Sequence, residues 1–156
     1  IFVGAAGRSL LAMKFLAMRL MQIGLKVYLV GEVCTPSIRE GDLLLVGSGS
    51  GETAGMIAIC KKAKAAGAEV AAFTKNRNST IASIAKVAVQ LNTAKPIQEG
   101  AAGPDGWIEG NYFSIRPSGN PFEQSIVIVG DAMVCELMQK TNCGTAKIAY
   151  NHANLE

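Results

Sequence analysis

Short apolar segments alternate with longer segments of helical periodicity up to Leu91, and this alternation limits the folds open to the chain. Runs of strand length occur at 1–4, 26–30, 43–46, 69–73 and 87–91. Between them, apolar residues recur at helical spacing at 10–21, 54–66 and 80–86. Alternation at this spacing predicts right-handed β–α–β units around a parallel sheet. We therefore expect an α/β fold: a three-layer sandwich with a five-stranded parallel sheet flanked by helices.

The alternation ends after Leu91. Residues 92–120 hold five glycines, three prolines and the only tryptophan, Trp107. A stretch of this length and composition is typical of a lid, an interface loop or a linker. Helical periodicity returns at 122–140, where Val, Ile and Met form a broad apolar face. We expect that face to belong to the core or to a subunit interface.

Composition excludes several classes of function. The chain has 156 residues, enough for one domain with a real core, and its net charge is only +3. No run of Lys and Arg is interleaved with aromatic residues, so nucleic acid is not an expected partner. Lys14 and Arg19 interrupt the most apolar early segment, so no membrane association is expected either.

The cysteines indicate a reducing compartment. Cys34, Cys60, Cys135 and Cys143 show no C-x-x-C spacing, and a single histidine accompanies them. This pattern favours neither a zinc site nor a disulfide framework, so we expect reduced thiols and a cytoplasmic location. The chain begins with Ile1 rather than Met, and we expect that an upstream segment is missing.

The Gly/Ser segment within "LLLVGSGSGETAGMIAI" (43–59) is the strongest functional signal. It lies between a buried apolar run and a helical stretch, where free backbone N–H groups and the helix dipole favour an anion. Ser48, Ser50 and Thr53 add hydroxyl donors, while Gly49 and Gly51 let the backbone approach a phosphate closely. The P-loop lysine is missing, so a nucleoside triphosphate is not expected. The alternative is that Ser50 is an ordinary helix N-cap.

A second loop, "GAAGRSL" at 4–10, occupies the same strand-to-helix position. It lacks the G-x-G-x-x-G pattern of dinucleotide-binding proteins. Gly7, Arg8 and Ser9 are candidates for contact with an anionic or hydroxylated ligand, although Arg8 could equally face solvent. Two such loops at one edge of a sheet fit a small phosphorylated ligand.

These segments carry a resemblance to a known family. "SGSGET" after a buried strand resembles the phosphosugar loop of sugar isomerase (SIS) domains. "FVGAAGRS", "AMRLMQIG", "KVYLVGE", "TPSIREGDLLLVGSGSGET", "NPFEQS" and "HANLE" together resemble the 6-phospho-3-hexuloisomerase family over nearly the whole chain. The resemblance implies a flavodoxin-like SIS domain spanning 1–156, whose early helical segment would precede Ile1.

The resemblance also implies a reaction, the interconversion of 3-hexulose 6-phosphate and fructose 6-phosphate in the ribulose monophosphate route of formaldehyde fixation. Moving a carbonyl from C3 to C2 through an enediol requires a general base, a group that moves hydroxyl protons and a phosphate anchor. The reaction requires no metal and no redox cofactor.

Glu123 and His152 are the candidate catalytic residues, because Glu and His can be tuned toward a neutral pKa. From the residues alone, Glu123 could be a first-turn acid after an Asn120 cap, and His152 a solvated tail residue. Glu52 is a weaker alternative base, since an acid at this position more often caps a helix.

Two other functions remain open. A non-catalytic sugar-phosphate sensor would use the same loop without Glu123 or His152, and another sugar-phosphate isomerase would differ in the loops at 31–41 and 92–120. We also expect a homo-oligomer, a dimer or tetramer. The resemblance suggests that the "HANLE" tail reaches toward a neighbour's pocket.

Overall fold

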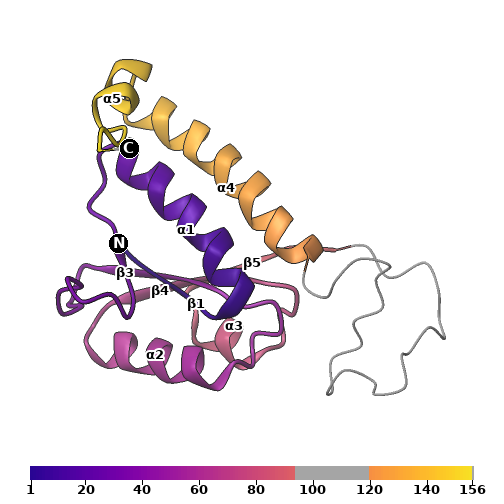
Figure 1. Cartoon of the computed structure of the whole chain (residues 1–156). Coiled ribbons are helices and arrows are strands. Elements are labelled where there is room, and N and C mark those ends of the chain that lie inside the picture. The colour runs from indigo at the N-terminus through magenta and orange to yellow at the C-terminus, as the bar shows by residue number, and fades with distance from the viewer. Residues whose placement is uncertain (94–119, 156) are drawn as a thin grey trace.

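A computed structural model describes residues 1–93 and 120–155 of the chain. In this structure a parallel sheet lies between two layers of helices (Figure 1). The stretch interpreted above as a lid, interface loop or linker, including Trp107, lies almost entirely outside the described residues.

The sheet has five parallel strands in the order β2-β1-β3-β4-β5. Its strands are β1 (Phe2–Ala5), β2 (Tyr28–Leu29), β3 (Leu43–Gly47), β4 (Glu69–Thr74) and β5 (Val87–Gln90). The central strand β3 pairs with β1 from Phe2↔Leu44 to Ala5↔Gly47. The predicted fold class is therefore confirmed, with all five strands in the expected parts of the chain.

Helices cover both faces of the sheet (Figure 1). The helices α1 (Gly7–Gln22), α4 (Asn120–Lys140) and α5 (Thr145–Tyr150) lie on one face. The helices α2 (Ala54–Ala65) and α3 (Thr80–Ile84) lie on the other. Among the described helices, none is both long and apolar enough to span a membrane.

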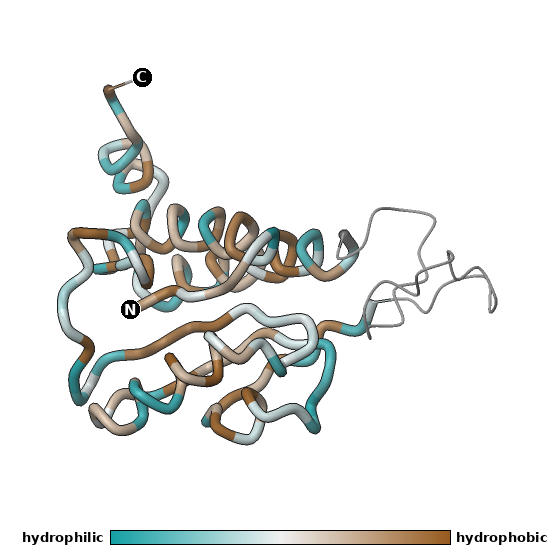
Figure 2. Tube along the Cα trace, turned by 60° about the horizontal axis from the view of Figure 1, so that its bottom comes forward, coloured by the Kyte–Doolittle hydropathy of each residue, from teal (hydrophilic) through white to brown (hydrophobic). Residues whose placement is uncertain are grey.

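Alternation along the strands divides the core into two halves. Val3, Leu45 and Phe73 pack in the cluster that includes α1 and α4. Their chain neighbours, such as Phe2 and Leu44, pack in the cluster that includes α2. Because a strand sends successive side chains to opposite faces, strands buried on both sides read as continuous apolar runs. Figure 2 shows hydrophobic residues along the strands, and hydrophobic and hydrophilic residues alternating along the helices.

The helices α1 and α4 run parallel to each other. Arg8 and Glu123 lie within 4.0 Å at their N-terminal ends, and Arg19 lies near Asp131 further along. Next to Asp131, a Cβ at Gly130 would come within 3.3 Å of a methyl group of Leu16 in α1, so the glycine allows the two helices to approach closely. Both helices therefore begin at the same edge of the molecule.

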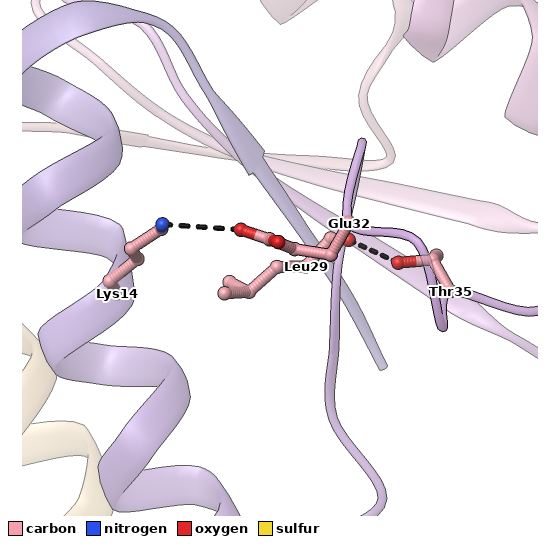
Figure 3. Close-up of polar contacts among 4 residues, drawn as sticks. All are labelled: Lys14, Leu29, Glu32 and Thr35. Atoms are coloured by element: carbon pink, nitrogen blue, oxygen red, sulfur yellow. Dashed lines mark hydrogen bonds and ion pairs between the residues drawn. The ribbon is translucent and has the colours of Figure 1, made fainter.

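The second strand is shorter than predicted. The apolar pattern indicated residues 26–30, but only Tyr28–Leu29 pair with β1, and the chain turns away at Gly31, whose φ is 95°. Figure 3 shows how the turn is held: the Thr35 hydroxyl donates to the Leu29 carbonyl, and Glu32 pairs with Lys14 of α1 at 3.3 Å. Both side chains of this ion pair are well exposed, so it contributes little stability.

The short helix α5 had no counterpart in the sequence prediction. It follows Asn142, which adopts a left-handed φ of 51° and ends α4. The side-chain amide of Asn151 donates to the carbonyl of Gln22 at 2.9 Å, and this bond fixes α5 to the C-terminal end of α1.

Candidate functional site

The candidate site lies at the carboxyl ends of β1 and β3, where the strand order reverses. From β1 the chain crosses to β2 on one side, and it then returns to β3 on the other side of β1. In open α/β sheets, ligands bind outside the strand ends at such a switch point. The two loops singled out in the sequence, 4–10 and 48–53, both begin at this point.

Backbone hydrogen bonds fix the loop at 48–53 against β4. Ser48 N–H donates to the carbonyl of Phe73 at 3.0 Å, and Lys75 N–H donates to the carbonyl of Gly49 at 3.0 Å. Gly51 has a φ of 69°, and a Cβ at this position would overlap Ser79 Oγ. The glycine is therefore required both by its backbone conformation and by the close approach of the 76–79 turn.

The hydroxyl groups of the loop are organised by the loop itself. Ser48 Oγ accepts the N–H of Gly51 at 3.1 Å and lies 3.1 Å from Thr53 Oγ1. Ser50 Oγ accepts the N–H of Glu52 at 3.2 Å. A hydroxyl that accepts from a backbone N–H keeps its own proton for an acceptor such as a phosphate oxygen.

The interpretation of Ser50 as a helix N-cap is wrong. Helix α2 begins at Ala54, and its N-cap residue is Thr53, whose side chain makes no capping hydrogen bond. The first N–H groups of a helix have no intrahelical partner, and they carry the positive end of its dipole. The start of α2 therefore provides amide donors in addition to the hydroxyls.

A cavity of about 140 Å³ joins this loop to three other segments. Its lining residues are Ala6, Ser9, Gly47, Ser48, Gly49, Ser50, Thr53, Lys75, Phe122 and Glu123. Six of the predicted site residues thus come together from β1–α1, β3–α2 and the start of α4. Gly7, Arg8 and Gly51 belong to the same loops but do not line the cavity.

One oxygen of Glu123 is buried without a hydrogen bond from the described part of the chain. Glu123 lies in the first turn of α4, its side chain is 13% exposed, and its Oε2 has no hydrogen-bond partner among the described residues. Arg8 Nε lies 4.0 Å from Oε2, and the Arg8 side chain is 58% exposed. A buried carboxylate oxygen without a donor is costly, and a substrate hydroxyl or C–H at this position would give it a partner.

Glu52 is occupied by a structural interaction. Its Oε1 accepts the backbone N–H of Thr80 at 2.7 Å, at the start of α3. This hydrogen bond lowers the pKa of Glu52. An exposed carboxylate held in this way favours helix capping over proton abstraction, as the sequence interpretation had suggested.

His152 does not reach the cavity of its own chain. The residue is exposed, and its Nδ1 lies 3.1 Å from the carbonyl of Ala153. Its neighbour Asn151 is bonded to Gln22, at the C-terminal end of α1, whereas Ser9 of the cavity lies in the first turn of α1. At 1.5 Å per residue these two ends of the helix are about 20 Å apart.

Two cavity residues were missed by the sequence analysis, Lys75 and Phe122. Lys75 directly follows β4, the strand beside β3, and Phe122 precedes Glu123. Position after a strand is the signal that could have found Lys75, because the ends of neighbouring parallel strands share one edge.

The cysteines and acidic residues do not form a metal site in the part of the chain that the structure describes. No group of three or more His, Cys, Asp or Glu side chains there could hold a metal ion, and all four cysteines are free. Burial raises the pKa of the Cys60 thiol to about 11, so Cys60 is a neutral core residue rather than a nucleophile.

Comparisons with known proteins find matches over most of the chain. The SIS domain model matches residues 1–104. The chain is 39% identical over 156 residues to a 3-hexulose-6-phosphate isomerase of Bacillus subtilis, and it spans 80% of that protein. It is equally similar to a 3-hexulose-6-phosphate isomerase of Mycobacterium gastri, of which it spans 73%. A solved structure from Methanococcus jannaschii has a similar fold, with a TM-score of 0.81 and 31% sequence identity. The match covers 99% of this chain and 77% of that one, and a molecular function of 3-hexulose-6-phosphate isomerase has been inferred for that protein.

Proposed function

The chain belongs to the SIS domain family, and we propose that it is an isomerase that interconverts 3-hexulose 6-phosphate and fructose 6-phosphate. Relatives that carry this activity in their names match all of the chain at 39% identity. The observation that carries the proposal is the shared cavity: the hydroxyl-bearing residues Ser48, Ser50 and Thr53 line it together with Glu123. The reaction needs both a phosphate anchor and a base within reach of the sugar.

The residues divide the chemistry as follows. The loop at 48–53 binds the phosphate on C6, and the sugar chain extends toward α4. In the direction from 3-hexulose 6-phosphate, Glu123 removes the proton on C2, next to the C3 carbonyl, and an enediol of C2 and C3 forms. Protonation of C3 then leaves the carbonyl on C2. Arg8, beside Glu123, stabilises the carboxylate and the developing negative charge on oxygen.

Hydrogen–deuterium exchange tests the proposed function directly. While the enediol exists, the abstracted proton is on the base and exchanges with solvent. Incubation of fructose 6-phosphate with the protein in deuterated water should therefore place deuterium on C3 of fructose 6-phosphate and on C2 of the 3-hexulose 6-phosphate that forms. Binding of fructose 6-phosphate without any exchange would instead indicate a sugar-phosphate sensor. Exchange of an aldose phosphate, with none for fructose 6-phosphate, would indicate a different isomerase.

Phosphate anchoring by the hydroxyls gives a first prediction. Ser50 is exposed at the cavity and its hydroxyl accepts the N–H of Glu52 within the loop, so Ser50→Ala removes a donor with little effect on the core. Loss of one hydrogen bond to a charged group should cost about 1.5–3 kcal/mol of binding free energy. Calorimetry with fructose 6-phosphate measures this loss. Ser83→Ala, on exposed α3, is the matched control, and equal affinities for the two variants would contradict the anchoring role.

A homo-oligomer is supported by apolar residues left on the surface of α1. Leu11, Phe15, Met18 and Met21 recur at helical spacing and are 41–61% exposed. Ile128 of α4, on the same side of the sheet, is 70% exposed. A stripe of this kind is typical of a helix that packs against another subunit. The broad apolar face predicted at 122–140 belongs to α4, and it packs partly in the same core cluster as α1. The exposed apolar surface therefore lies mainly on α1.

Light scattering should therefore give a mass of at least two chains at micromolar concentration, for a dimer or a tetramer. Leu11→Glu with Phe15→Glu should shift the mass toward that of one chain, because both charges would enter the interface. A monomeric mass for the unmodified protein would refute the oligomer.

The setting of the reaction follows from the same proposal. We infer that residues 1–156 act as a single SIS domain in the cytoplasm, within the ribulose monophosphate route of formaldehyde fixation. The match to the family model ends at residue 104, but α4 packs in the same core cluster as α1, which supports one domain. Four free cysteines support a reducing compartment.

A further inference from the structure

We propose that Lys75 is a phosphate-binding residue of this site, a cation that adds to the neutral donors of the loop at 48–53. The inference rests on the proposed function, because it assumes a sugar phosphate in the cavity. It concerns a residue outside both of the loops that the sequence analysis singled out.

The backbone of Lys75 is held at the cavity. Its N–H donates to the carbonyl of Gly49 at 3.0 Å, and its carbonyl accepts the side-chain amide of Gln90 at 3.0 Å. The preceding residue, Thr74, is fully buried, and its Oγ1 accepts the N–H of Asn76. Lys75 is thus anchored to the phosphate loop on one side and to β5 on the other.

The side chain of Lys75 extends over the phosphate loop. A Cβ at Gly49 would lie 3.2 Å from Lys75 Cε and 3.3 Å from Phe122 Cδ1. Gly49 therefore lies between the lysine and the start of α4, and the end of the lysine side chain is beside the loop's backbone. Lys75 itself lines the cavity with Ser48, Ser50 and Thr53.

Charge balance explains why a cation is needed there. A phosphate monoester carries about −1.5 to −2 charges at pH 7. The loop offers hydroxyls and amides, which are neutral, while Glu123 adds a negative charge in the same cavity. Among the described residues that line the cavity, Lys75 carries the only positive charge. Without it, a dianion would bind in a cavity whose lining carries only the negative charge of Glu123, and Arg8, 4.0 Å from that carboxylate, lies outside the lining.

Lys75→Met tests the proposal, because it keeps the length of the side chain and removes its charge. We expect the Kd for fructose 6-phosphate to rise about 10- to 100-fold, as for loss of a charge-assisted hydrogen bond. KM should rise by a similar factor with kcat nearly unchanged, since the phosphate lies away from the reacting carbons. Binding should also become less sensitive to salt. Lys75→Arg should restore most of the affinity.

Lys86→Met is the matched control, because Lys86 pairs with Glu69 on the surface outside the cavity. Thermal unfolding of each variant separates loss of binding from loss of the fold. If Lys75→Met folds and keeps the Kd and salt dependence of the unmodified protein, the proposal is wrong even though isomerisation continues. If the unmodified protein binds fructose 6-phosphate but does not isomerise it, the proposed function fails, and the comparison of Kd values still tests Lys75.

Discussion

Glu123→Gln is expected to abolish deuterium incorporation at carbon while leaving the affinity for fructose 6-phosphate nearly intact. The amide has almost the same shape as the carboxylate but cannot accept a proton from carbon. A positioned general base contributes about 10²–10⁴-fold to a rate, so the exchange rate should fall by at least that factor. Mass spectrometry of the recovered sugar measures the exchange, and calorimetry measures binding.

The geometry of Glu123 makes this the most informative substitution. Its Oε2 is buried and has no hydrogen-bond partner among the described residues, and Glu123 lines the same cavity as the loop at 48–53. A first-turn acid that only stabilised α4 through the helix dipole would sit in solvent and could be replaced at little cost. Glu136→Gln, on an exposed part of the same helix, is the matched control and should exchange at the normal rate.

Wild-type exchange rates in Glu123→Gln would place the base elsewhere. Glu52 would be the next residue to test, but its carboxylate already accepts the N–H of Thr80 at 2.7 Å, and this bond lowers its pKa. A base with a lowered pKa holds the abstracted proton less well, so Glu52 is suited to fixing α3 rather than to proton transfer.

The strands were predictable because their signal is local. A strand covered on both faces reads as a near-continuous apolar run, and LLLV in β3 and VAAF in β4 are such runs between helical segments. The edge strand β2 was predicted too long, since "KVYLV" has strand-forming residues throughout but pairs only at Tyr28 and Leu29. How many residues of an edge strand pair depends on where the chain turns away, here at Gly31.

The helix α5 was missed because long-range contacts support it. Six residues are too few for periodicity to show, and a helix this short is not stable alone. It is held by the bond from Asn151 to Gln22 and by packing of Ile148 against the core. Gln22 is more than 100 positions away from Asn151 in the chain, so the local sequence does not reveal this contact.

The candidate site was predictable where one loop contains it and not where the fold assembles it. Hydroxyl residues and glycines between a strand and a helix are a local sequence signal, and this signal identified Ser48, Ser50 and Thr53. Lys75 is an ordinary surface lysine in the sequence, and it joins the site only because β4 lies next to β3. The position of His152 could not be deduced at all, since it depends on α5.

The second large effect is expected for substitution of His152. Mixed oligomers of two inactive variants should show which subunit supplies this histidine to a given cavity. A 3-ketose phosphorylated on O6 cannot close the usual furanose ring through that oxygen, so it should be mainly open-chain, whereas fructose 6-phosphate cyclises through O5. We propose that His152 moves the hydroxyl protons of ring opening. At saturating substrate, His152→Gln should then lower kcat from fructose 6-phosphate more than kcat of the reverse reaction, and a positioned acid–base group contributes about 10²–10⁴-fold.

Within one chain His152 lies at the far end of α1 from the cavity, so this role requires the histidine of a second subunit. Glu123→Gln and His152→Gln homo-oligomers should each be nearly inactive in the direction from fructose 6-phosphate. Co-expression of the two variants should produce mixed oligomers in which one kind of site combines an intact Glu123 with an intact His152 from the other chain. For random pairing in a two-fold symmetric assembly, this recovers about a quarter of the normal activity. If mixed oligomers, purified through two different tags, stay as inactive as the parents, then His152 does not act across the subunit interface.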